Sequence, residues 1–125
     1  MKILVVDDEK MILDLTRRIL ERAGFEVETI DSGIEATRLF RSSHENISLA
    51  IIDFSLGDKP GTEVIEEVRK IQPELPVIVS SGHILHPSDL PSQVQDNVTF
   101  LQKPYRANTL IEQVQLALNS KRAAH

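Results

Sequence analysis

Short apolar runs that end in polar residues constrain the fold of this 125-residue chain more than any other feature. In the clearest of them, residues 48–53, an unbroken apolar stretch leads into Asp53 and is followed by a loop that contains Gly and Pro. Such a run, bounded by turn residues, is typical of a strand buried on both faces of a parallel sheet. Because open parallel sheets bind ligands at the carboxyl ends of their strands, Asp53 is a candidate site residue.

Similar runs alternate with helical patterns along the chain. The sequence predicts strands at residues 3–6, 25–30, 48–53, 76–82 and 98–101. Between them apolar residues recur at helical spacing, for example at residues 11–23, where Gly24 supplies a C-cap, and after the capping box that begins at Ser32. This alternation predicts an α/β fold, because each right-handed crossover lays a helix on one face of a parallel sheet.

The segment between the last two predicted strands, residues 83–97, breaks the alternation. Pro87 and Pro91 each remove a backbone donor and bias the preceding residue away from helical geometry. Only Leu90 and Val94 keep a helical spacing there. We therefore expect a short or irregular segment in place of a fourth helix.

Composition excludes several classes of protein. The net charge of −5 argues against general nucleic-acid binding, and aromatic residues make up only 4% of the chain. The chain has no cysteine and no long apolar stretch, so neither disulfides nor insertion into a membrane is expected. We expect a cytoplasmic monomer or weak dimer, with one domain at residues 1–120 and a C-terminal tail at residues 121–125.

Polar residues that end the predicted strands are expected to meet, because the carboxyl ends of parallel strands share one edge of the sheet. These residues are Asp7, Asp8, Asp53, either Ser80 or Ser81, and Lys103. Carboxylates packed together repel one another unless a cation lies among them, and an all-oxygen ligand set favours Mg²⁺ over zinc. With Lys103 as a further positive charge, the set suits phosphoryl transfer with one carboxylate as the nucleophile.

Over nearly its whole length, the sequence resembles the receiver domains of bacterial two-component response regulators. The resemblance rests on Val-Val-Asp-Asp-Glu at residues 5–9, the strand that ends in Asp53, Gly61, Ser81-Gly82 and Lys103-Pro104. It implies a flavodoxin-like fold, a doubly wound five-stranded parallel sheet of strand order 2-1-3-4-5. It also implies a phosphoacceptor signalling module that slowly autodephosphorylates and is not a turnover enzyme.

The resemblance further implies a role for each site residue. Asp53 accepts a phosphoryl group from a histidine kinase or a histidine phosphotransfer protein, and Lys103, in a cis peptide bond with Pro104, binds a phosphoryl oxygen. Ser81 is the switch hydroxyl and Phe100 the switch aromatic. The implied ligands of Mg²⁺ are Asp7, Asp8, Asp53 and the backbone carbonyl of Ser55. The cognate kinase and the downstream target are not specified by the sequence.

Two features depart from the family pattern. Gly57 stands where the family usually has Pro, and residues 83–97 lack the usual Gly-Ala before the last strand. This shortened form resembles receivers attached to, or working beside, hybrid sensor kinases. We expect residues 83–97 to be mobile before phosphorylation, and the signal to come from their ordering or from the first and last helices.

Other interpretations stay open. The main alternative is an Mg²⁺-dependent phosphohydrolase of the aspartyl-phosphate type, although Ser55 stands where such enzymes carry a second acid. A nucleotide-binding domain is disfavoured, because Asp7 and Asp8 would repel phosphates and no Gly-rich turn follows the first strand. Single residues also have simpler structural interpretations. Asp7 and Asp8 could cap the first helix, Lys103 could be a solvated surface residue and Phe100 a core residue. Ser80 could face the site in place of Ser81.

Overall fold

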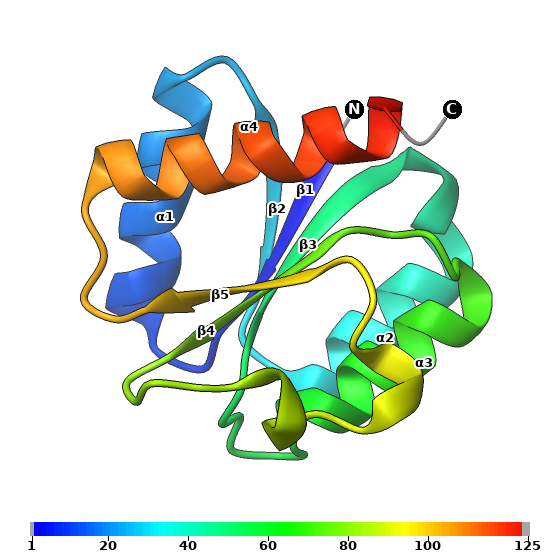
Figure 1. Ribbon diagram of the computed structural model, residues 1–125. Coiled ribbons are helices and arrows are strands. Elements are labelled where there is room, and N and C mark those ends of the chain that lie inside the picture. Colours follow the sequence, from blue (N-terminus) through cyan, green and yellow to red (C-terminus); the bar gives the residue numbers. More distant parts are fainter. Residues whose placement is uncertain (1, 124–125) are drawn as a thin grey trace.

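Five parallel strands form the centre of the protein, in the order β2-β1-β3-β4-β5 (Figure 1). They are β1 (Lys2–Val6), β2 (Glu26–Ile30), β3 (Ile47–Asp53), β4 (Val77–Ser81) and β5 (Val98–Gln102). The computed structural model describes residues 2–123. The predicted fold and strand order are confirmed, and every observed strand overlaps its predicted range.

Two pairs of helices cover the two faces of the sheet. They are α1 (Lys10–Arg22) with α4 (Ala107–Ala123) on one face, and α2 (Gly33–Ser43) with α3 (Gly61–Ile71) on the other (Figure 1). Each pair buries apolar side chains against the sheet, so two cores form. The central strands β1 and β3 contribute alternate residues to both cores, which explains why their sequences are almost uninterruptedly apolar.

The register of the strands brings the predicted site residues to one edge of the sheet. Val6 pairs with Ile52, so the residue after β1 lies at the level of Asp53 at the end of β3. Asp53 in turn pairs with Ser80, and Ser81 pairs with Gln102, which precedes Lys103.

The segment between β4 and β5, which we call the β4–β5 segment (residues 82–97), is irregular, as predicted. Its backbone contains two 3-10 turns, η2 (Pro87–Asp89) and η3 (Ser92–Val94), but no α-helix among the described residues. Leu90 is 4% exposed and Val94 2% exposed, and both belong to the core beneath α2 and α3. The segment is therefore anchored by two side chains although its backbone is not helical.

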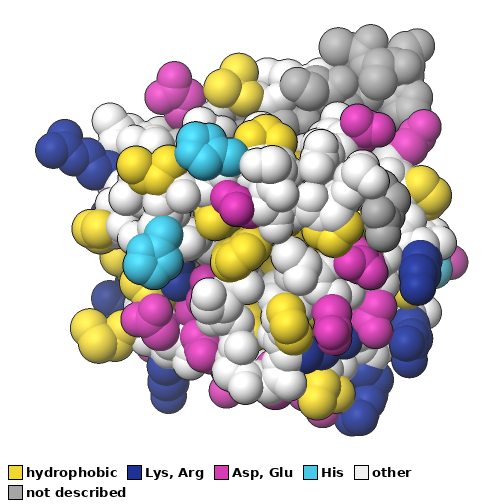
Figure 2. All heavy atoms as spheres, turned by 60° about the horizontal axis from the view of Figure 1, so that its bottom comes forward, with side chains coloured by type: hydrophobic (Ala, Val, Ile, Leu, Met, Phe, Trp, Pro, Cys, Tyr) yellow, Lys and Arg dark blue, Asp and Glu magenta, His cyan; other side chains and the backbone are white. Residues whose placement is uncertain are grey.

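Figure 2 shows the side of the molecule that forms the bottom of Figure 1, where this segment lies. Hydrophobic side chains are scattered there among polar and charged ones and do not merge into one large patch. Ile84 is the most exposed large hydrophobic residue of the segment, at 71%. At the end of the segment Asn97 has a φ of 56°, and its carbonyl accepts a hydrogen bond from Nη2 of the buried Arg69 at 2.9 Å.

Helix ends follow the predicted signals at two places. Gly24 has a φ of 96° and its N–H donates to Glu21, as a left-handed C-cap requires. Ser32 is the N-cap of α2, and its Oγ accepts a hydrogen bond from the N–H of Glu35 at 3.2 Å. Helix α4 continues to Ala123, past the predicted domain end, because residues 121–123 favour helix. Residues 124–125 of the predicted tail lie outside the described residues.

Candidate functional site

Four acidic side chains gather at the carboxyl edge of the sheet. Asp7, Asp8 and Glu9 follow β1 and Asp53 ends β3, and one carboxylate oxygen from each lies within 4.8 Å of the others. Asp7 is 2% exposed and Asp53 is 4% exposed, whereas Asp8 and Glu9 are exposed. We call these four residues the acidic cluster. It exists because β1 and β3 are neighbouring parallel strands that end at the same level.

Lys103 places its ammonium group among these acids. Its Nζ lies 2.7 Å from Asp7 Oδ2, 3.2 Å from Asp53 Oδ2 and 3.5 Å from Glu9 Oε1. The Lys103 N–H donates to the carbonyl of Ser81 at 2.7 Å, and the bond to Pro104 is cis, as the resemblance implied. The end of β5 is thus joined to the ends of β1 and β3 by one cation.

Burial and neighbouring charges together shift the pKa values of Asp53 and Lys103. Burial raises the pKa of the Asp53 carboxyl and the charge of Asp7 raises it further, while Lys103 opposes both effects only in part. Burial alone would lower the pKa of Lys103, but its hydrogen bond to Asp7 and the charges of Asp7 and Asp53 hold it above the usual value. The pKa of Lys103 rises because Lys103 interacts with two acids, whereas the pKa of Asp53 rises because burial and an acidic neighbour outweigh the effect of one cation.

The donor set fits a hard divalent cation such as Mg²⁺. Mg²⁺ binds carboxylate and carbonyl oxygens and keeps several waters, which requires an open side. Asp53 and Asp7 offer buried oxygens, and the exposed Asp8, which has no ion-pair partner among the described residues, lies on the solvent side. An added cation would relieve the repulsion that raises the pKa of Asp53.

The loop after β3 approaches the acidic cluster very closely. A Cβ atom at Gly61 would lie 2.1 Å from the carbonyl oxygen of Asp53, so only glycine fits at this position. A Cβ atom at Gly57 would lie 3.4 Å from Asp8 Oδ2. Ser55 is exposed, and its N–H donates to Asp53 Oδ1 at 3.3 Å. The loop therefore forms one wall of the site.

Ser80 and Ser81 are both buried at the end of β4. The Oγ of Ser81 accepts a hydrogen bond from the N–H of His83 at 3.0 Å. A hollow of about 200 Å³ lies beside Ser81, and Phe100 forms part of its wall. Phe100 is partly buried and packs against the core beneath α2 and α3, so it is a core residue that also faces this hollow.

Two contacts at the site were not predicted from the sequence. Glu9 joins the acidic cluster, and its N–H donates to Asp7 Oδ1 at 2.9 Å; its place directly after Asp7 and Asp8 was the signal. The hydroxyls of Thr16 and Tyr105 are also hydrogen-bonded, which ties α1 to the loop after β5. No sequence signal connects these two residues, since they lie 89 positions apart.

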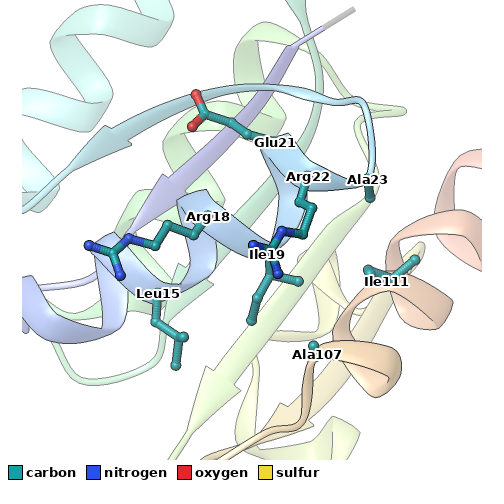
Figure 3. Close-up of a pocket in the computed structure, with 8 residues that line it drawn as sticks. All are labelled: Leu15, Arg18, Ile19, Glu21, Arg22, Ala23, Ala107 and Ile111. Atoms are coloured by element: carbon teal, nitrogen blue, oxygen red, sulfur yellow. The ribbon is translucent and has the colours of Figure 1, made fainter.

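A larger hollow, of about 560 Å³, lies away from the acidic cluster, between α1 and α4 (Figure 3). It is lined by Leu15, Arg18, Ile19, Glu21, Arg22, Ala23, Ala107 and Ile111. None of the predicted site residues is among them, so this hollow is separate from the acidic cluster. No helix in the described part of the chain is long and apolar enough to span a membrane.

Comparisons with solved structures agree with this fold. The CheY-like receiver domain protein of Methanospirillum hungatei JF-1 is 30% identical with a TM-score of 0.88, covering 99% of this chain and 98% of that one. A receiver domain protein of Clostridium thermocellum is 31% identical with a TM-score of 0.87, again covering 99% and 98%.

Comparisons of sequence lead to the same family. The chain is 30% identical over 122 residues to the transcriptional regulatory protein GlrR of Escherichia coli K12, which is 98% of this chain and 27% of that protein. The chain thus spans about a quarter of that curated relative's length. Residues 3–115 match the family model of the response regulator receiver domain. The chain therefore belongs to the response regulator receiver domains, the phosphoacceptor signalling modules of two-component systems.

Proposed function

We propose that Asp53 is the phosphoacceptor of this receiver domain. The observation that carries the proposal is the Lys103 ammonium, 2.7 Å from Asp7 and 3.2 Å from Asp53 at the carboxyl edge of the sheet. Lys103 lies where it can neutralise a phosphoryl oxygen beside the Asp53 carboxylate. Such a point charge, fixed next to a nucleophile, is what phosphoryl transfer needs from a protein.

The proposed step is a direct transfer. One Asp53 carboxylate oxygen attacks phosphorus, the new P–O bond forms as the P–N bond to a partner's histidine breaks, and the imidazole nitrogen keeps the electron pair. The two Asp53 oxygens already differ, because Oδ1 accepts from the Ser55 N–H and Oδ2 contacts Lys103. Lys103 then stays with the phosphoryl group and holds the aspartyl phosphate in place.

Receiver domains generally bind Mg²⁺ at their acidic pocket. We assign the ion here to Asp7, Asp8, Asp53 and the backbone carbonyl of Ser55, where it would supply positive charge for the phosphoryl oxygens. We assign the switch to Ser81 and Phe100, which line the same hollow of about 200 Å³. A hollow beside Ser81 leaves room for these side chains to move when Asp53 is modified.

The proposal extends to partners and setting. The donor would be a histidine kinase or a histidine phosphotransfer protein, and the domain, at residues 1–120, would act in the cytoplasm as a signalling module that dephosphorylates itself slowly. Met11, just after the acidic cluster in sequence, is 85% exposed and offers apolar surface to such a partner.

A phosphohydrolase of the aspartyl-phosphate type is less well supported. Such an enzyme needs an acid near the nucleophile to protonate the leaving group, and the residue two positions after Asp53 is Ser55. The acids around Asp53 are close to Lys103 and to one another, which suits cation binding better than proton donation.

Incubation with acetyl phosphate and Mg²⁺, followed by intact-mass measurement, tests the proposal. The protein should gain one phosphoryl group, and Asp53→Asn should gain none. Asp31→Asn, which removes an exposed acid outside the acidic cluster, is the matched control and should be labelled normally. Equal labelling of Asp53→Asn would refute the assignment, and many turnovers per protein molecule would favour the phosphohydrolase.

A further inference from the structure

We propose that Asp58 and Lys59 are positioning residues that fasten the β3–α3 loop, residues 54–60, to the N-terminus of α2 and thereby preform the acidic site. The proposal rests on the proposed function, because the site that the loop completes is the Mg²⁺ and phosphoryl site. No sequence pattern predicted these attachments, because the capping box at Ser32 predicts only contacts within α2.

Asp58 makes the first attachment, to the first turn of α2. Its Oδ2 accepts hydrogen bonds from Ser32 Oγ at 2.7 Å and the Ile34 N–H at 3.0 Å, and its Oδ1 accepts from the Gly33 N–H at 3.0 Å. The two N–H groups have no acceptor within the helix, and a carboxylate at a helix N-terminus also interacts favourably with the helix dipole. The same bonds hold the pKa of Asp58 well below its usual range, so it stays charged.

Lys59 makes the second attachment, to the side of α2 and to α3. Its Nζ forms an ion pair with Glu67 on α3 and lies 3.3 Å from the hydroxyl oxygen of Thr37 on α2. Thr37 is buried, and its hydroxyl is 2.7 Å from the same Glu67 oxygen. The Lys59 side chain is only 15% exposed, so this ion pair is better shielded from water than a surface pair.

Close packing makes the third attachment. A Cβ atom at Gly33 would lie 2.8 Å from Lys59 Cγ and 3.2 Å from Leu56 Cδ1, so the first residue of α2 touches the loop directly. Two side chains of the loop therefore lie close to the start of the helix, and a glycine there lets them approach. Leu56 also packs against the core beneath α2 and α3.

The fastened loop is also the wall of the acidic cluster. It begins directly after Asp53, it passes Asp8 at Gly57, and it is followed by Gly61, which lies against the Asp53 carbonyl. A free loop at this place would sample many conformations, and that conformational freedom would have to be lost when a cation binds. The α2 attachments remove that entropy before binding, which is preorganisation.

A simple capping role does not account for these contacts. Ser32 already caps α2 through the Glu35 N–H, and Lys59 bonds to residues beyond the first turn. Both loop residues reach back over 20 residues or more to α2. The effect that the contacts of Asp58 and Lys59 share is to hold the β3–α3 loop against α2.

Three variants test the proposal: Asp58→Ala, Lys59→Met and the control Asp31→Ala, which removes an exposed acid just before Ser32 that makes no hydrogen bond or ion pair among the described residues. Mg²⁺ affinity is measured by calorimetry, and loop motion by amide hydrogen exchange of residues 54–59. Asp58→Ala should raise the Kd for Mg²⁺ roughly tenfold, which is the lower end of the effects seen when a residue that orients metal ligands is replaced. Lys59→Met should act in the same direction, and the control should match the parent.

The labelling rate with acetyl phosphate separates positioning from loss of structure. At low Mg²⁺ both variants should be labelled more slowly than the parent, and saturating Mg²⁺ should restore the parent's rate. Faster exchange confined to the first turn of α2, with Mg²⁺ affinity and loop exchange equal to the Asp31→Ala control, would reduce Asp58 to a helix cap and overturn the proposal. A parent protein that binds no Mg²⁺ would instead overturn the proposed function, and loop exchange would still reveal whether the attachments exist.

Discussion

At the scale of single residues, the buried carboxylate of Asp53 destabilises the folded state when it is ionised. Burial and the charge of Asp7 raise its pKa, which means that its ionised form is less favourable in the folded protein than in the unfolded chain. We expect Asp53→Asn to raise the free energy of unfolding at pH 7 by about 1 kcal/mol. Chemical denaturation without Mg²⁺ measures this, with Asp31→Asn as a control that should change nothing.

The pH dependence of that gain follows from the same shift. A raised pKa means that the folded state holds the Asp53 proton more tightly, so the parent loses stability as the pH rises from 3.8 through the raised value. The advantage of Asp53→Asn should therefore be full above that window and absent below pH 3.8. An advantage that grows as the pH falls would contradict the assigned cause.

Gly61 gives a second prediction at this scale. A Cβ atom there would meet the Asp53 carbonyl oxygen at 2.1 Å and Phe54 Cα at 2.9 Å, both of them backbone atoms that cannot swing away. Gly61→Ala should lower the free energy of unfolding by about 3 kcal/mol. Gly82→Ala, where a Cβ would meet nothing within 4 Å, should be close to neutral or slightly stabilising.

At the scale of elements, the β4–β5 segment stands out because it is irregular and yet closes a core. Leu90 is 4% exposed, so Leu90→Ala should lower the free energy of unfolding by about 3 kcal/mol. Leu116→Ala, on α4 at a position that is 57% exposed, should change it by less than about 0.5 kcal/mol. Equal effects of the two variants in denaturant would show that the segment is not anchored as described.

The mobility of this segment stays a prediction. Without a phosphoryl mimic, the amides of residues 83–97 should exchange hydrogen faster than those of α1. When the mimic binds, exchange in residues 83–97 should become slower. Equal protection in both states would contradict it.

Local signals account for the parts of this protein that the sequence could predict. Apolar runs ending in acids defined β1 and β3, and Pro87 and Pro91 ruled out a helix before β5. The attachment of Asp58 to α2 could not be predicted, because it joins residues 24 to 26 positions apart whose spacing carries no period. The same holds for Arg69, whose partner is a backbone carbonyl at Asn97.

At the scale of the whole molecule, stability should depend on the divalent cation. An ion that binds only the folded state stabilises it by mass action, by about 2.7 kcal/mol at a hundredfold excess over Kd. The melting temperature should therefore rise with Mg²⁺, and Asp8→Ala should lose most of the rise. Asp14→Ala, an exposed acid on α1 outside the acidic cluster, should keep it. A parent melting temperature that ignores Mg²⁺ would exclude the metal site.

The position of Lys103 bears on whether the protein needs a bound cation in order to fold. Because its ammonium already lies between Asp7 and Asp53, the chain supplies an internal counterion for its own most crowded acids. Folding then does not have to wait for metal, unlike in small domains whose structure forms only around an ion. A divalent cation bound at the acidic cluster could therefore dissociate without unfolding the protein.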